Sequence, residues 1–98
     1  MKLDQVKAAL LANEATLKRM GVRTISVFGS VARGEDGHDV DLLADFDQAL
    51  SLVDVVNIEQ TLESMLGTDV DLVQDGTLKK RMRERVQQEL VRGFLPIS

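Results

Sequence analysis

The sequence predicts a two-layer α+β domain, in which helices pack on one face of a small mixed β-sheet. Two observations lead to this expectation. Short segments rich in β-branched residues or with alternating polarity lie between segments whose apolar residues recur at helical spacing, and glycines stand where several of these segments end. The chain has 98 residues, which is enough for one domain and too few for two, so residues 1–98 are expected to form one domain.

The first predicted element is a helix that ends before Gly21, a residue type common just after a helix. Its apolar residues at helical spacing are Leu3, Val6, Leu10, Leu17 and Met20. Segment 24–28 then reads Thr-Ile-Ser-Val-Phe, which is typical of a strand, and Gly29 and Ser30 end it abruptly. One short helical turn is expected after Ser30.

Segment 39–46 alternates in polarity and predicts a second strand with one apolar face. Ser51, with Asp54 three residues later, resembles a capping box at the start of a second long helix, which Gly67 ends. Segment 69–73 predicts a third short strand.

A last helix is expected over residues 78–92, with Gly93 beyond its end and a basic exposed face. The basic residues are Lys79, Lys80, Arg81, Arg83 and Arg85. Such a series is usually a solvated face, and the alternative is an interaction surface for an acidic partner or RNA.

Composition excludes several classes of protein. The net charge of −4 argues against a general nucleic-acid binder, and the absence of cysteine excludes disulfides and thiolate metal sites. No apolar run is long enough to span a bilayer, and the charged N-terminal segment is not a signal peptide. A cytoplasmic protein with no membrane partner is therefore expected.

Gly29 and Ser30, at the end of the first strand, form a candidate phosphate site. Glycine lets a phosphate approach the backbone closely, and the serine hydroxyl is a further donor. Alone, however, this dipeptide is a commonplace turn.

Asp39 and Asp41 begin the second strand and point to the same face, because residues two apart in a strand share a face. Adjacent carboxylates repel unless a cation lies between them, and their hard oxygens suit Mg²⁺. A solvated polar face is the alternative for a lone Asp-x-Asp. If the third strand pairs with the second, Asp71 can add the third carboxylate that a two-metal site needs.

The stretch 28–43, Phe-Gly-Ser-Val-Ala-Arg-Gly-Glu-Asp followed by Asp-Val-Asp-Leu-Leu, resembles the nucleotidyltransferase superfamily typified by the polymerase-β palm. Within it, the chain length and the wording Gly-Ser-x-Ala-Arg-Gly are similar to those of the minimal nucleotidyltransferases, the MNT antitoxins paired with HEPN toxins. The resemblance extends over nearly the whole chain, since Asp-Val-Asp-Leu-Val at 69–73 and the basic helix also match that group.

The resemblance implies a palm-like fold and transfer of a nucleoside monophosphate, AMP from ATP, onto an acceptor, which would be a HEPN toxin. It also implies that Gly29 and Ser30 hold the triphosphate, that Asp39 and Asp41 bind two Mg²⁺ ions, and that Asp71 completes the metal site and helps to activate the acceptor. Arg33 would touch phosphate or stabilise the loop.

One departure from the family favours an alternative function. Only residues 31–38 separate Gly-Ser from Asp-x-Asp, fewer than is usual, and His38 stands where serine is common. His38 is interpreted as a loop residue, because Mg²⁺ prefers oxygen ligands. The alternative is an inactive antitoxin that neutralises the toxin by binding alone.

A small-molecule transferase or a polymerase is disfavoured, because 98 residues leave no room for a second domain. The oligomeric state is left open.

Overall fold

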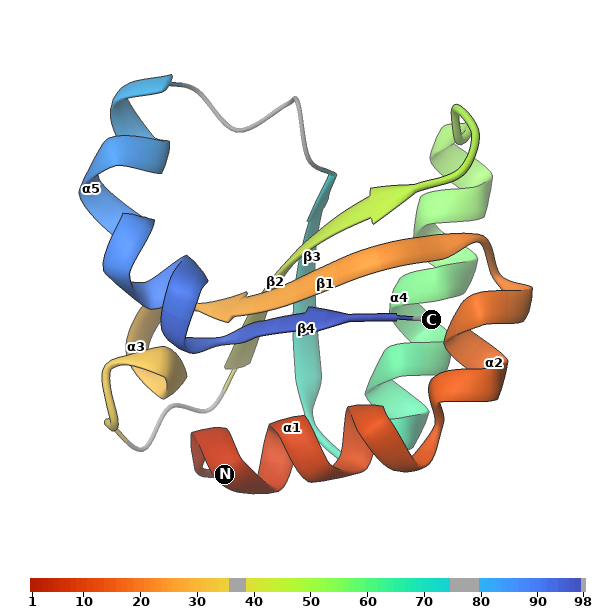
Figure 1. Ribbon diagram of the computed structural model, residues 1–98. Coiled ribbons are helices and arrows are strands. Elements are labelled where there is room, and N and C mark those ends of the chain that lie inside the picture. Colours follow the sequence, from red (N-terminus) through yellow and green to blue (C-terminus); the bar gives the residue numbers. More distant parts are fainter. Residues whose placement is uncertain (36–38, 75–79, 98) are drawn as a thin grey trace.

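The computed structural model describes residues 1–35, 39–74 and 80–97. The elements follow one another as α1 (Leu3–Ala12), α2 (Glu14–Arg19), β1 (Val22–Phe28), α3 (Gly29–Ala32), β2 (Asp39–Phe46), α4 (Leu52–Leu66), β3 (Asp69–Gln74), α5 (Lys80–Arg92) and β4 (Phe94–Pro96). The strands form a mixed sheet of order β3-β2-β1-β4 (Figure 1). Strands β2 and β3 are parallel, whereas β1 is antiparallel to both β2 and β4. The predicted α+β fold class is confirmed.

The main core lies between one face of the sheet and helices α1, α2 and α4. Alternate residues of the strands point into it, and they meet the apolar sides of the three helices. Its completely or almost completely buried residues include Val6, Leu10, Leu17, Ile25, Val27, Val40, Leu42 and Leu62. No helix in the described part of the chain is long and apolar enough to cross a membrane.

The ends of α4 are formed as the sequence predicts. The Asp54 amide donates to the Ser51 hydroxyl at 3.1 Å, and the Ser51 amide donates to the Asp54 carboxylate at 3.0 Å, which completes a capping box. At the other end Gly67 has the left-handed φ of 69° that glycine adopts without strain.

The prediction of one helix before Gly21 is wrong, because the segment is divided into α1 and α2 at Asn13. The Asn13 side-chain amide donates to the Ala9 carbonyl at 2.8 Å, and its backbone leaves the helical region. Asparagine side chains compete with the backbone for such hydrogen bonds and so interrupt helices. The two helices run in different directions (Figure 1).

The C-terminal part of the sheet is a second correction. Three strands were expected, and the structure adds β4, which pairs with β1 between residues 24 and 26. Pro96 obscured this strand in the sequence, since proline donates no ladder hydrogen bond, but it is tolerated in a strand at the edge of a sheet.

The expectation that all helices pack on one face does not hold for α5. Leu90 of α5 is buried with Leu43 of β2, and Val86, Phe28 and Val73 pack around this pair. These strand residues point away from the main core, so α5 covers part of the opposite face. The start of the predicted helix, residues 78 and 79, lies outside the described residues.

Candidate active site

Four carboxylates line the end of the sheet where β2 and β3 begin. The parallel register places Asp39 opposite Asp69 and Asp41 opposite Asp71. All four point away from the main core, as the alternation of buried and exposed residues along both strands shows. Asp39, Asp69 and Asp71 are exposed, whereas Asp41 is half-buried. The alternation of side chains along the strands therefore predicted correctly that Asp39, Asp41 and Asp71 lie on the same face of the sheet.

The turn at Gly29 lies directly beside Asp41. Phe28, the last residue of β1, is paired with Asp41, so the chain leaves the sheet next to this carboxylate. Gly29 has a φ of 74°, and a Cβ atom at this position would overlap the Asp41 carboxylate. Glycine is therefore required here for both its backbone conformation and its lack of a side chain.

The electrostatic environment of Asp41 disfavours its charged form. Burial raises the pKa of the Asp41 carboxyl above its ordinary value, and the charges of Asp71 and Asp39 raise it further. The Arg33 guanidinium opposes this increase, while Glu89 adds to it. Asp71 lies directly opposite Asp41 in the register of β2 and β3, whereas Asp69 lies opposite Asp39. A cation beside Asp41 would relieve the repulsion.

The carboxylates do not form a complete metal cage in this conformation. Within residues 1–35, 39–74 and 80–97, no three carboxylate or imidazole groups stand close enough together to hold an ion jointly. The strand register places Asp39, Asp41 and Asp71 on one face at one end of the sheet, but the three carboxylates do not form a preformed set of ligands. The oxygen donors still fit Mg²⁺, because Mg²⁺ is commonly held by one or two carboxylates together with substrate phosphates and water.

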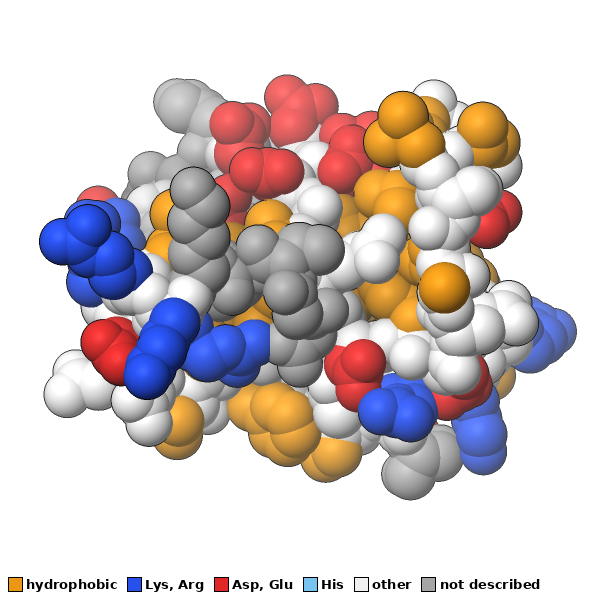
Figure 2. Space-filling model, turned by 90° about the horizontal axis from the view of Figure 1, so that it is seen from above, with side chains coloured by type: hydrophobic (Ala, Val, Ile, Leu, Met, Phe, Trp, Pro, Cys, Tyr) orange, Lys and Arg blue, Asp and Glu red, His pale blue; other side chains and the backbone are white. Residues whose placement is uncertain are grey.

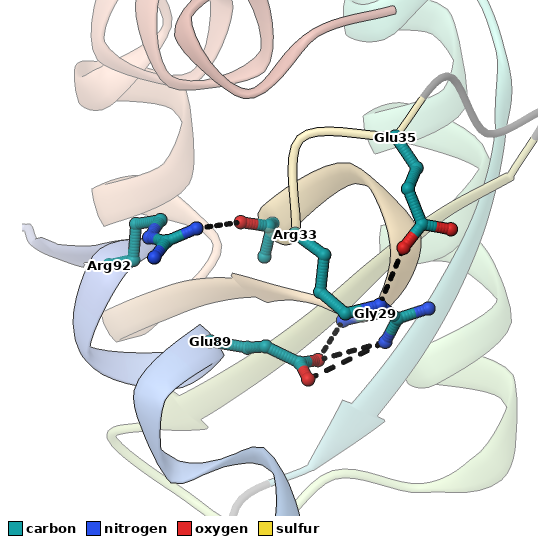
Figure 3. A network of polar contacts seen from close by, with 6 residues as sticks. Gly29, Arg33, Glu35, Glu89 and Arg92 are labelled. Carbon is teal, nitrogen blue, oxygen red and sulfur yellow. Dashed lines mark hydrogen bonds and ion pairs between the residues drawn. The ribbon is translucent and has the colours of Figure 1, made fainter.

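Two of the predicted phosphate-binding groups, the Gly29 amide and the Arg33 side chain, have partners within the protein (Figure 3). The Gly29 amide donates to the Glu89 carboxylate of α5 at 2.8 Å. Arg33 forms an ion pair with Glu35 at 2.9 Å and a longer one with Glu89 at 3.4 Å. Arg33 is thus held by two carboxylates in this structure. His38 lies outside the described residues.

Glu89 is a residue of the site that the sequence did not indicate. It lies 60 residues from Gly29 along the chain, on a helix interpreted there as a basic exposed face, and no motif includes it. Its side chain is only 15% exposed. Viewed from above, Lys and Arg side chains gather on the side where α5 lies, and Asp and Glu side chains gather separately (Figure 2). Glu89 is therefore an acid largely buried on a helix whose other charged residues are basic apart from one exposed acid, Glu84.

Comparisons with known proteins agree with this arrangement. Residues 12–92 match the family model described as polymerase beta, nucleotidyltransferase. The protein adenylyltransferase MntA of Thermococcus cleftensis is 40% identical over 94 residues, covering 93% of this chain and 95% of that protein.

Solved structures show the same fold. One described as a minimal nucleotidyltransferase superposes with a TM-score of 0.73 at 36% identity, covering 98% of this chain and 96% of the other. A chain from the structure of a toxin–antitoxin MntA–HpeT variant has a TM-score of 0.63 at 25% identity, with 88% and 73% covered. The family match, the fold and the Gly-Ser and Asp-x-Asp motifs together show that this chain belongs to the polymerase-β nucleotidyltransferase family and, within it, to the minimal nucleotidyltransferases.

Proposed function

We propose that this nucleotidyltransferase transfers AMP from ATP onto a side-chain hydroxyl of a partner HEPN toxin, with Mg²⁺ as its metal, and thereby acts as an antitoxin. The name of the Thermococcus cleftensis relative, a protein adenylyltransferase, supports a protein acceptor and an adenylyl group. The toxin–antitoxin structure with a similar chain supports the pairing with a toxin.

The observation that carries the proposal is the meeting of three backbone segments at one end of the sheet. The register of β2 and β3 brings Asp41 beside Asp71, and the pairing of β1 with β2 brings the Gly29 turn to the same place. Carboxylates and a glycine turn in this arrangement suit a metal-bound triphosphate, because the acids attract the cation and the turn admits a phosphate.

In the proposed reaction, the acceptor oxygen forms a bond to the α-phosphorus of ATP, the bond from this phosphorus to the bridging oxygen breaks, and pyrophosphate leaves. Asp71, which is exposed to an incoming acceptor, takes the hydroxyl proton. Asp39 and Asp41 would hold Mg²⁺, which would neutralise the phosphate charge. Ser30 holds the triphosphate through its hydroxyl, while Gly29 provides the space beside Asp41.

The test is transfer of label from ATP labelled at the α-phosphate to the toxin encoded by a neighbouring gene. We expect the wild type to label the toxin in the presence of Mg²⁺, and the double variant Asp39→Ala, Asp41→Ala to label nothing. Labelling that survives the double substitution would refute the assignment.

Asp71 and Asp69 provide a matched pair, since both are exposed acids on the same face of β3. We expect Asp71→Asn to reduce transfer strongly and Asp69→Asn to reduce it much less, because Asp71 lies directly opposite Asp41 in the register of β2 and β3, whereas Asp69 lies opposite Asp39. Equal effects of the two substitutions would contradict the role given to Asp71.

A second function is binding to the toxin without chemistry. It is favoured by the absence of three jointly placed metal ligands among the described residues. In that case the double variant Asp39→Ala, Asp41→Ala would still protect cells from the toxin, and no label would be transferred by the wild type.

A further inference from the structure

The helix that follows the Gly-Ser turn is too short to hold its own shape. Helix α3 has four residues, Gly29–Ala32, and its N-cap residue Phe28 supplies no side-chain hydrogen bond. A helix of one turn leaves most of its terminal amides and carbonyls without partners inside the helix, and the nucleation of so short a helix is unfavourable. Its position must therefore be fixed from outside.

Helix α5 provides a partner at each end of α3. The Glu89 carboxylate accepts the hydrogen bond of the Gly29 amide at the N-terminal end, and the Arg92 guanidinium donates to the Ala32 carbonyl at 3.3 Å at the C-terminal end (Figure 3). An anion at the N-terminus and a cation at the C-terminus is the arrangement that the helix dipole favours. The charges of Glu89 and Arg92 are thus matched to the two ends that they contact.

The end of α5 is in turn joined to the strand that leads into the turn. The Val27 amide of β1 donates to the Gly93 carbonyl at 3.0 Å, and the Gly93 amide donates to the Glu89 carbonyl at 2.9 Å. A Cβ at Gly93 would overlap the backbone of Val27, so the chain after α5 lies directly against β1. The buried contact between Leu90 and Leu43 adds a second attachment, to β2.

These contacts connect the turn to the carboxylates. Strand β2, which Leu90 contacts through Leu43, also carries Asp41, and the turn held by Glu89 has no room for a side chain beside Asp41. Movement of the turn by even a fraction of a side-chain length would therefore change the space between Gly29 and Asp41. Glu89 also holds Arg33, the residue that follows α3.

We infer that Glu89 and Arg92 are positioning residues, which hold the Gly29–Ser30 turn at the distance from Asp41 that the nucleotide triphosphate requires. This inference rests on the proposed function for the step that it serves. It assigns to α5 a role inside the site, in addition to any role of its basic face.

The first experiment measures hydrogen exchange of the Gly29 amide by NMR in the wild type, Glu89→Ala and Glu89→Gln. The glutamine keeps an oxygen acceptor at the same reach. We expect exchange roughly tenfold or more faster in Glu89→Ala, from the loss of one charge-assisted hydrogen bond, and close to the wild-type rate in Glu89→Gln. The control is Glu84→Ala, an exposed acid on the same helix.

The second experiment measures steady-state transfer with the same variants. Because the turn is proposed to hold the triphosphate, we expect Glu89→Ala to raise the KM for ATP about tenfold, with a smaller change in kcat, and Glu89→Gln to recover most of this loss. If Glu89 had a purely structural role, Glu89→Ala would lower the melting temperature but would not raise KM more than it changes kcat, and Glu89→Gln would not restore the KM for ATP. Equal KM values for Glu89→Ala and Glu84→Ala would overturn the inference.

Arg92→Ala is the second variant, which keeps the test valid if Glu89→Ala does not fold. It removes the contact with Ala32 and leaves Glu89 in place, so a smaller increase in KM and in exchange at Gly29 is expected, with Arg81→Ala as the exposed control. If the wild type transfers no nucleotide, the proposed function fails, whereas hydrogen exchange still decides whether the two residues hold the turn. Unchanged exchange in both Glu89→Ala and Arg92→Ala would refute the positioning role.

Discussion

Replacement of Gly29 by alanine separates the two reasons for which the structure requires glycine at this position. The first is backbone conformation, since an L-residue at a φ of 74° is strained by about 1–2 kcal/mol. For a domain of this size, that strain lowers the melting temperature by roughly 4–16 °C. The second is space, since the new Cβ would overlap the Asp41 carboxylate.

The two effects differ in what they change. The Asp41 carboxylate is the end of a side chain and can rotate away from the new methyl group, so the overlap adds little to the loss of stability. Rotation, however, takes the carboxylate from its place beside Asp71 and Asp39, and a displacement of about 1 Å in a catalytic group commonly reduces the rate about 100-fold. We therefore expect Gly29→Ala to remain folded while kcat/KM for ATP falls about 100-fold or more.

Gly67→Ala is the matched control. Gly67 ends α4 with a φ of 69°, nearly that of Gly29, and a Cβ there would meet no atom within 4 Å. It should lose as much stability as Gly29→Ala and retain transfer activity. Thermal unfolding followed by circular dichroism measures the first quantity, and the labelled-ATP assay measures the second. Equal activities of the two variants at equal stability would refute the spatial argument about Asp41.

Three further predictions follow from burial, charge and metal chemistry. Leu62→Ala removes a completely buried side chain of α4 and should lower the free energy of unfolding by about 2–5 kcal/mol, whereas Leu52→Ala, at a residue 80% exposed, should change it by less than about 0.5 kcal/mol in chemical denaturation. Asp41→Asn should raise the melting temperature near neutral pH, because the raised pKa of Asp41 in the folded state means that its ionised carboxylate opposes folding. This gain should disappear as pH falls below the ordinary range of carboxyl pKa values, where the wild-type carboxyl is protonated in both the folded and the unfolded state. A gain in melting temperature that persists at such a pH would contradict the electrostatic cause. Mg²⁺ alone should raise the melting temperature little, since no three of the described groups form a metal cage. Mg²⁺ together with a non-hydrolysable ATP analogue should raise it clearly. Equal increases in melting temperature in a thermal-shift assay would show that a metal site exists without nucleotide.

Local patterns were sufficient to predict most of the fold. The capping box at Ser51, the turn at Gly67 and the alternation along β2 each depend on residues close together in the sequence, and each is formed as expected. The break at Asn13 was missed because apolar spacing continues through it, while the interruption comes from one side-chain hydrogen bond. Strand β4 was missed because a three-residue strand exists only through its pairing with β1.

The same distinction separates the predicted and unpredicted parts of the site. Asp39 and Asp41 share a face because side chains alternate along a strand. They lie near Asp71 because β2 and β3 are adjacent parallel strands. The partner of the Gly29 amide could not be predicted in this way. Glu89 reaches it only because α5 crosses to the opposite face of the sheet, and a helix with mostly basic exposed residues gives no sign of which single acid points inward.

The site contains a carboxylate whose charged form opposes folding. Asp41 is half-buried among other acids, and burial together with the charges of Asp71 and Asp39 raises its pKa above the ordinary value. The main core on the other face does not depend on these residues, because its buried side chains come from the opposite side of the same strands. Because the core and the site lie on opposite faces, the free energy gained by burial in the core can offset the unfavourable free energy of keeping the carboxylates close together. This separation also explains why two substitutions on opposite faces of the sheet should have opposite effects on stability: Asp41→Asn is expected to stabilise the protein and abolish transfer, whereas Leu62→Ala should destabilise it and leave the chemistry of the folded fraction unchanged.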